Sequence, residues 1–143
     1  MSNSNSILKI LEKVKLLKSK ERFEEALEVL EELNKNHPDT EVVKKTLIET
    51  LFAYGGFLND YYTLEYEKAK QIFERIIKIS PRNYRAIYNL GLAYFNLEDN
   101  KNAKKCFNKA LRIKPNYKYC LYNLGLVYEN SEDFKKALNF YER

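Results

Sequence analysis

Few residues in this sequence have the chemistry of a nucleophile, a general base or a metal ligand. His37 is the single histidine, and it precedes Pro38 at the end of a predicted helix, where a cation interacts favourably with the helix dipole. Cys106 and Cys120 have neither CxxC spacing nor neighbouring metal ligands. A glycine-rich phosphate loop and a Ser/His/Asp or Cys/His set are also missing. The sequence therefore predicts no catalysis, no metal site and no cofactor.

The composition is that of a helical protein rich in tyrosine. Hydrophobic residues make up 45% of the 143 residues and charged residues 31%, which suits one domain with a buried core. Four glycines and three prolines leave few places where helices must break. Because a tyrosine hydroxyl requires water or a partner, some of the 12 tyrosines should lie at the surface.

No segment of the sequence is typical of a membrane or exported protein. It contains no run of 18 apolar residues, and the N-terminus lacks the apolar stretch of a secretory signal. The prediction is a cytoplasmic protein without membrane contact. Residues 1–6 are polar, alternate serine with asparagine, and are predicted to form a disordered tail.

The net charge of +5 is unevenly distributed. Residues 84–143 contain eleven Lys and Arg against six Asp and Glu, whereas residues 1–83 are balanced. This excess favours an acidic protein or peptide as partner, and the alternative is a solvated surface that aids solubility. Acidic residues interrupt the basic stretch and argue against nucleic acid. They are Glu98, Asp99, Glu129 and Asp133.

An internal repeat of 34 residues is the strongest pattern in the sequence. Residues 84–109 and 118–143 are identical at eleven of 26 positions. A fixed period of this length indicates stacked units of supersecondary structure. The identical residues of the first copy are Tyr88, Asn89, Leu90, Gly91, Leu92, Tyr94, Asn96, Glu98, Asp99, Lys101 and Ala103.

The repeat resembles the tetratricopeptide repeat family, in which an apolar residue, Leu-Gly, Tyr, Ala, an aromatic residue and Pro recur at set spacings. The family pattern places tryptophan where this chain has Ile87 and Leu121. The resemblance implies an all-α, right-handed superhelical array of antiparallel helical hairpins, with the first helices lining a concave groove. The matching residues are Leu90, Gly91, Tyr94, Ala103, Phe107, Ala110 and Pro115, then Leu124, Gly125, Tyr128, Ala137 and Tyr141.

Four units are predicted, at about 7–40, 41–83, 84–117 and 118–143. The first is marked by its apolar spacing, and the last is truncated. Pro38 and Pro81 are 43 residues apart, so the second unit has a nine-residue insertion. We expect one helix over residues 41–59, in which the Gly55-Gly56 pair matches the small residue of the other units. Asp60 to Leu64 should form a loop that exposes Tyr61 and Tyr62.

The helical spacing predicts which residues face the groove. Aromatic rings there would cover apolar side chains of a bound peptide, and asparagine amides would bond to its backbone. The alternative is that Asn-Leu-Gly is simply common in this repeat. The predicted groove residues are Arg85, Tyr88, Asn89, Leu92 and Asn96 in the third unit, and Tyr119, Tyr122, Asn123, Leu126 and Asn130 in the fourth.

Some proteins of this family grip a terminal carboxylate with a clamp of Lys, Asn, Asn, Lys and Arg. The corresponding residues here are Lys45, Glu49, Asn89, Tyr119 and Asn123. Because Glu49 would repel a carboxylate, and Tyr119 and Asn123 replace cations, no such clamp is predicted.

The predicted function is that of a scaffold or adaptor that binds a peptide or helix in the groove. The last unit stops at Arg143, before the usual proline and capping helix, which would expose an apolar end. One alternative is therefore a homodimer through this C-terminal hairpin. The others are that the chain is part of a longer array or a regulatory segment of a larger protein.

Overall fold

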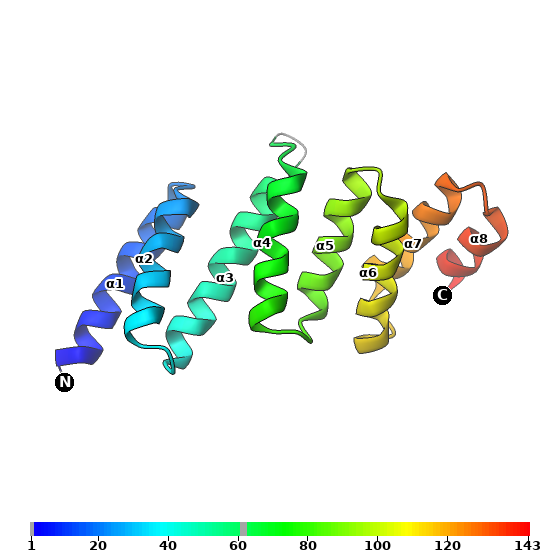
Figure 1. Cartoon of the computed structure of the whole chain (residues 1–143). Helices are drawn as coiled ribbons and strands as arrows, with labels where there is room; N and C mark the ends of the chain where they lie inside the picture. Colours follow the sequence, from blue (N-terminus) through cyan, green and yellow to red (C-terminus); the bar gives the residue numbers. More distant parts are fainter. Residues whose placement is uncertain (1, 61–62) are drawn as a thin grey trace. The chain divides into compact units, whose positions relative to one another are not determined.

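The computed structural model describes residues 2–60 and 63–143, which form eight helices and no strand (Figure 1). The predicted all-α array of helical hairpins is confirmed. The helices are α1 (Ser2–Ser19), α2 (Phe23–Asn36), α3 (Glu41–Leu58), α4 (Tyr66–Ile79), α5 (Tyr84–Asn96), α6 (Asn100–Ile113), α7 (Lys118–Asn130) and α8 (Phe134–Glu142).

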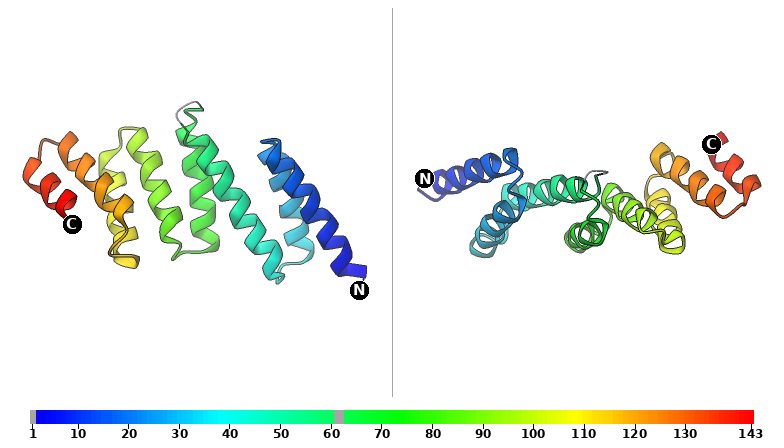
Figure 2. Two further views of the ribbon diagram at one scale, coloured as in Figure 1. Left: turned by 180° about the vertical axis from the view of Figure 1, so that it is seen from behind. Right: turned by 90° about the horizontal axis from the view of Figure 1, so that it is seen from above.

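The chain divides into two compact units. The first, Met1–Tyr54, contains α1, α2 and most of α3, and the second, Gly55–Arg143, contains the end of α3 and the remaining helices. In the first unit α1 packs against α2. In the second, α4 packs on α5, α5 on α6, α6 on α7 and α7 on α8. Successive helices within each unit run in opposite directions (Figure 2).

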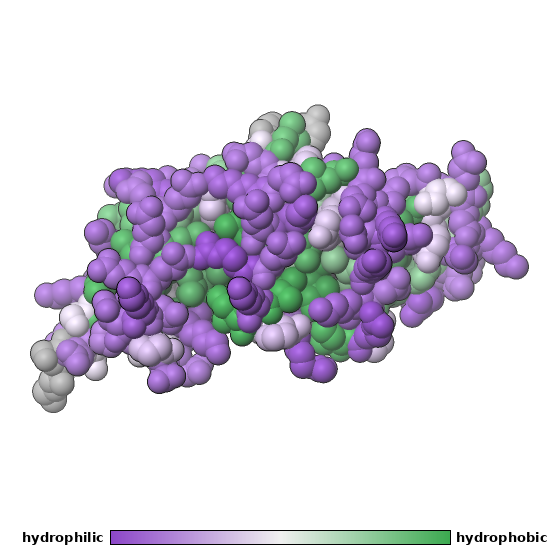
Figure 3. Space-filling model, in the orientation of Figure 1, coloured by the Kyte–Doolittle hydropathy of each residue, from purple (hydrophilic) through white to green (hydrophobic). Residues whose placement is uncertain are grey.

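The core of the second unit lies between its hairpins. Apolar residues of α6 recur every three or four positions, which places them on one face of the helix. On the face of the molecule seen in Figure 3, hydrophilic side chains cover much of the surface, with apolar side chains between them. The buried residues of this core are Ile87, Ala103, Phe107, Ala110, Leu111, Cys120, Leu121, Leu124 and Val127.

The third and fourth hairpins turn through the same hydrogen-bonded motif. In the third, the amide of Asp99 donates to the carbonyl of Tyr94 at 2.9 Å, and Glu98 has a left-handed backbone with φ of 61°. The fourth repeats it with Asp133 and Glu132. This is a Schellman motif, whose left-handed position favours glycine. Asp99 then accepts a hydrogen bond from the Asn102 amide and so caps the next helix.

Glycine allows the two helices of a hairpin to approach closely. A Cβ at Gly91 would lie 2.6 Å from Cε1 of Phe107, and one at Gly55 would lie 2.6 Å from Cζ of Phe73. A Cβ at Gly125 would overlap the ring of Tyr141. The backbone of the first helix therefore supports an aromatic ring of the second in each hairpin of this unit.

The insertion in the second hairpin preserves this contact. Ten residues separate Pro81 from Gly91, whereas 17 separate Pro38 from Gly55. Because seven additional residues are close to two turns of helix, Gly55 keeps the phase that Gly91 has in its own helix. This explains how a longer α3 still presents glycine to Phe73.

The N-terminus differs from the prediction. The sequence predicts a disordered tail over residues 1–6, but α1 begins at Ser2, so residues 2–6 are helical. The hydroxyl of Ser6 donates to the carbonyl of Asn3 at 2.8 Å within this turn. Extending an existing helix requires no new nucleus, which offsets the weak helix propensity of serine and asparagine. Tyr61 and Tyr62, predicted to be exposed, lie outside the described residues.

Alanine should have opposite effects on stability at Gly91, which contacts an aromatic ring, and at Gly56, which does not. Gly91→Ala should lower the free energy of unfolding by about 1–3 kcal/mol, because Phe107 has to move. Gly56 is the matched control, since a Cβ there meets nothing within 4 Å in the described part of the chain. Gly56→Ala should stabilise the helix by about 0.5–1 kcal/mol. Urea denaturation measures both, and a stable Gly91→Ala variant would contradict the close approach.

Glycine should be favoured at the left-handed turn. Glu98→Gly should raise the free energy of unfolding by about 0.5–1 kcal/mol, because glycine adopts this backbone without a steric cost. Glu98→Ala is the control, since it removes the same carboxylate but keeps a Cβ. Thermal and urea denaturation of the two variants should separate the effect of the backbone conformation from that of the lost charge. Equal free energies of unfolding for Glu98→Gly and Glu98→Ala would count against a strained turn.

Candidate functional site

The predicted groove residues lie on α5 and α7 and differ in accessibility. Tyr119 and Tyr122 are 64% and 58% exposed, and Asn123 is 8% exposed. Arg85, Asn96 and Asn130 are also exposed, whereas Tyr88, Asn89, Leu92 and Leu126 are half-buried.

Tyr88 and Asn123 join the two helices. The Nδ2 atom of Asn123 donates to the hydroxyl of Tyr88 at 3.1 Å and to the carbonyl of Tyr119 at 2.8 Å. A side-chain amide has two N–H donors, and a buried amide requires partners for them. The amide nitrogen of Asn123 therefore holds the hairpins together and has no donor left for a ligand.

A cluster of aromatic rings surrounds Tyr88. Its centroid lies 5.3 Å from that of Tyr117, in an edge-to-face arrangement, and 5.8 Å from that of Phe107. Tyr84 and Tyr119 also contact the ring of Tyr117, at 5.1 and 5.4 Å between centroids. Such pairs stabilise a structure beyond the area they bury. Tyr84 and Tyr117 were not among the predicted groove residues, although Tyr84 begins the predicted third unit and Tyr117 directly precedes the fourth.

The cluster keeps its phenols neutral. Burial is the main cause that raises the pKa of Tyr88 well above its ordinary value of 10, and the Asn123 hydrogen bond lowers it by a smaller amount. Burial also raises the pKa of Tyr117. Neither hydroxyl is suited to act as a base near neutral pH, so the cluster supports the face by packing rather than by proton transfer.

The asparagines of α5 also bond within the chain. The Nδ2 atom of Asn89 donates to the carbonyl of Arg85 at 2.8 Å. The Nδ2 atom of Asn96 donates to Oδ1 of Asn59 at 3.3 Å, and Nδ2 of Asn59 donates to the carbonyl of Asn89 at 3.4 Å. These bonds fix the orientation of the side chains at this edge of the face.

The exposed rings of α7 rest on other rings. Tyr119 contacts Tyr88 with centroids 6.1 Å apart, and Tyr122 lies 5.9 Å from Tyr141. The hydroxyl of Tyr141 donates to Oε2 of Glu129 at 2.6 Å, and this bond is the main cause that raises its pKa to about 12. Tyr119 and Tyr122 therefore pack on other rings, while most of their surface stays exposed to solvent.

The cysteines are poorly placed for nucleophilic chemistry. Both thiols are free, and Cys120 is buried. Burial raises the pKa of Cys106 to about 11 and that of Cys120 to about 12, which suppresses the reactive thiolate. Within the described residues, no three His, Cys, Asp or Glu side chains could hold a metal ion, and no helix is long and apolar enough to cross a membrane. The absence of catalysis stays a prediction.

Family models identify the repeat. Tetratricopeptide repeat models match residues 84–117 and residues 120–143, which are the third and fourth hairpins. The third and fourth hairpins are therefore tetratricopeptide repeats. The repeats support a coarse function, that of a protein–protein interaction scaffold. No curated protein sequence matches the chain.

Solved structures show the same fold at low identity. "MamA AMB-1" has a TM-score of 0.66 and 20% identity, covering 93% of this chain and 68% of that one. MamA from Desulfovibrio magneticus RS-1 has a TM-score of 0.63 and 20% identity, covering 93% and 70%. The first tetratricopeptide repeat domain of Spaghetti (RPAP3), solved with an HSP90 peptide, has a TM-score of 0.58 and 17% identity, covering 87% of this chain and 92% of that one.

The bond between Tyr88 and Asn123 should contribute to stability. Tyr88→Phe leaves a buried amide hydrogen unpaired and should lower the free energy of unfolding by about 1–2 kcal/mol. Tyr119→Phe, at a 64% exposed ring, is the control and should change it by less than about 0.5 kcal/mol. A double-mutant cycle with Asn123→Ala should show coupling, and additive effects would contradict the bond.

Proposed function

We propose that this protein binds a peptide or helix of another protein along the face made by α5 and α7. The observation that carries the proposal is the exposure of Tyr119 and Tyr122, at 64% and 58%, on a rigid aromatic support. Exposed aromatic rings are enriched at the energetic centres of protein interfaces. Because these rings are already held in place, little side-chain entropy is lost when a partner covers them.

The polar groups of this face suit a peptide backbone. Asn96 and Asn130 are exposed at the C-terminal ends of the two helices, and Arg85 is exposed at the start of α5. An extended peptide offers carbonyl and amide groups at regular intervals, and asparagine can bond to either. Leu92 and Leu126 lie half-buried on the same helices and add apolar surface.

The proposed mode differs from a terminal-carboxylate clamp. The RPAP3 domain of similar fold was solved with the HSP90 peptide SRMEEVD. In this chain, the amide nitrogen of Asn123 already bonds to Tyr88 and to the carbonyl of Tyr119. We therefore expect recognition of an internal segment through apolar side chains.

The second candidate is self-association through the last hairpin. Phe134, Leu138 and Tyr141 of α8 are 64%, 57% and 41% exposed. A pocket of about 380 Å³ lies at the same end, between α7 and α8, and is lined in part by Leu121 and Tyr122. Such an apolar end could pair with a second copy of the chain. Under both candidate functions, we expect a cytoplasmic protein that has no catalytic activity.

Removing the exposed rings should weaken binding of a selected peptide. Peptides chosen from a displayed library against the full chain would be measured by fluorescence anisotropy. Tyr119→Ala and Tyr122→Ala should each raise Kd by about tenfold or more, as expected for an interface anchor. Phe134→Ala is the control, because this ring is equally exposed but lies on α8, and its effect should stay below about twofold.

Two outcomes would count against the groove. One is that peptides bind as tightly to the Tyr119→Ala and Tyr122→Ala variants as to the wild type. The other is that light scattering shows a dimer that Leu138→Glu dissociates while no peptide is selected. The second outcome would support self-association through α8.

A further inference from the structure

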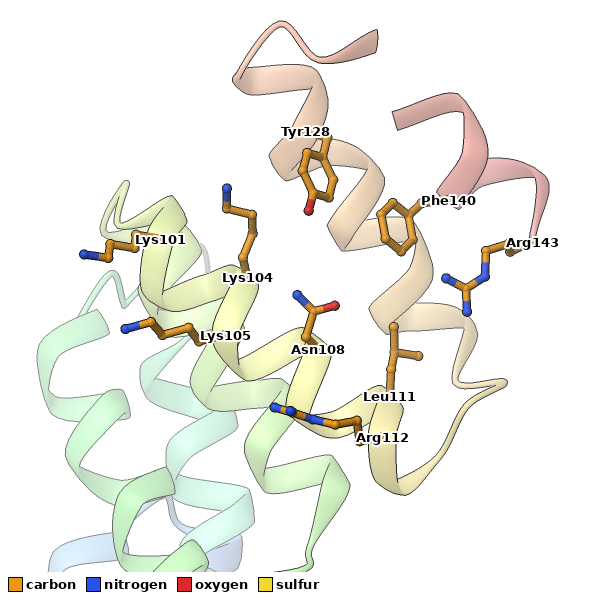
Figure 4. A pocket seen from close by; sticks show the side chains of 9 residues that line it. All are labelled: Lys101, Lys104, Lys105, Asn108, Leu111, Arg112, Tyr128, Phe140 and Arg143. Carbon is orange, nitrogen blue, oxygen red and sulfur yellow. The ribbon is translucent and has the colours of Figure 1, made fainter. Parts of the chain in front are cut away.

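A pocket of about 790 Å³ lies on the α6 and α8 side of the last two hairpins (Figure 4). It is separate from the proposed peptide-binding face, which belongs to α5 and α7. Its size is within the range of pockets that take a ligand or several side chains of a partner. Its lining residues are Lys101, Lys104, Lys105, Asn108, Leu111 and Arg112 of α6, Tyr128 of α7, Phe140 of α8, and Arg143.

Two stacked rings form one wall of the pocket. Tyr128 and Phe140 are nearly parallel, with 5° between their planes and 5.4 Å between centroids. The Nζ atom of Lys104 lies 5.2 Å from the Tyr128 centroid, and the guanidinium of Arg143 lies 5.3 Å from that of Phe140. In Figure 4 the four side chains follow one another across the pocket. Contacts between cations and rings hold the charges near an apolar surface.

The charge of the pocket is of one sign. Five of its nine lining residues are Lys or Arg, and none is Asp or Glu. The 14 residues of α6 contain no acidic residue. Lysines four residues apart, such as Lys101 and Lys105, repel each other and destabilise a helix. Among the described residues, these five cations form no ion pair within 4.0 Å.

We propose that this pocket binds an acidic segment of a partner protein, with an apolar side chain against Leu111 and the edge of the Phe140 ring and carboxylates on the surrounding cations. A partner carboxylate near Lys105 and Arg112 would relieve the repulsion along α6. Leu111 is 8% exposed and belongs to the core, so it gives the apolar contact a fixed base. The proposal adds a second binding surface to the scaffold and does not depend on the first.

The pocket is better suited to an acidic protein segment than to nucleic acid. Single-stranded nucleic acid binds by stacking its bases on aromatic faces. Here Tyr128 is stacked on Phe140, and Lys104 and Lys136 both lie over its ring, at 5.2 and 5.3 Å. Arg143 lies over the ring of Phe140. The faces of both rings are therefore covered, which leaves no face on which a base could stack. Lys101, Lys105 and Arg112 lie over neither ring and remain available to carboxylates.

The test measures binding of a dye-labelled peptide of alternating Glu and Asp around a central Leu to the full chain by fluorescence anisotropy. Lys105→Glu, in the pocket, should raise Kd by about tenfold or more, which is the low end of the effect expected when a close charge pair across an interface is lost. Lys109→Glu is the matched control, with the same charge change on the same helix but outside the pocket lining. It should raise Kd by less than about threefold.

Further binding measurements distinguish an acidic peptide from other ligands. The proposal requires weaker binding when the central Leu of the peptide is replaced by Ser, and restored binding of a Lys-containing peptide to the Lys105→Glu variant. It is overturned if Lys109→Glu is as harmful as Lys105→Glu, since only the diffuse charge would then matter. Tighter binding of an oligothymidylate, or loss of acidic-peptide binding in Tyr122→Ala, would overturn it in favour of nucleic acid or of the α5 and α7 face.

Discussion

The fold of the second unit depends on the close contact between a glycine of one helix and an aromatic ring of the next. Gly55 faces Phe73, Gly91 faces Phe107 and Gly125 faces Tyr141, each at a distance that excludes a Cβ. Because the ring rests on backbone, the helix axes come together and the ring becomes part of a continuous core. Phe107 and Phe73 are fully buried in this way.

This contact also decides which surfaces are available for binding. With Phe107 fixed, Tyr88 packs on its ring and receives the Asn123 hydrogen bond, which ties the third hairpin to the fourth. One side of the hairpins then presents the exposed tyrosines of α7, and another presents the basic pocket of α6 and α8. The two surfaces differ in chemistry, so the two binding sites proposed for them would select different partners.

Most of the fold could be predicted because its signals are local. In the third and fourth hairpins, the period of 34 residues and the Leu-Gly pairs indicate two helices in each unit, and the structure has these helices. The tail over residues 1–6 was mispredicted because serine and asparagine have weak helix propensity, whereas continuation of an existing helix outweighs it. The length of the insertion could be read from the sequence. That seven of its residues add about two helical turns before Gly55 becomes clear only from the contact between Gly55 and Phe73.

The sequence by itself determined the repeat, the hairpins and the residues of α5 and α7 that share a face, because helical spacing is a property of neighbouring residues. Only the tertiary structure decided what those residues do. Asn123 and Tyr88 are 35 residues apart, and their bond removes an amide from the predicted groove. The basic pocket is likewise lined by residues of α6, α7 and α8 and by Arg143. No local sequence pattern could therefore reveal that its charged lining residues are all Lys or Arg. Burial and long-range contacts, which the sequence does not state, decide which side chains remain open to a partner.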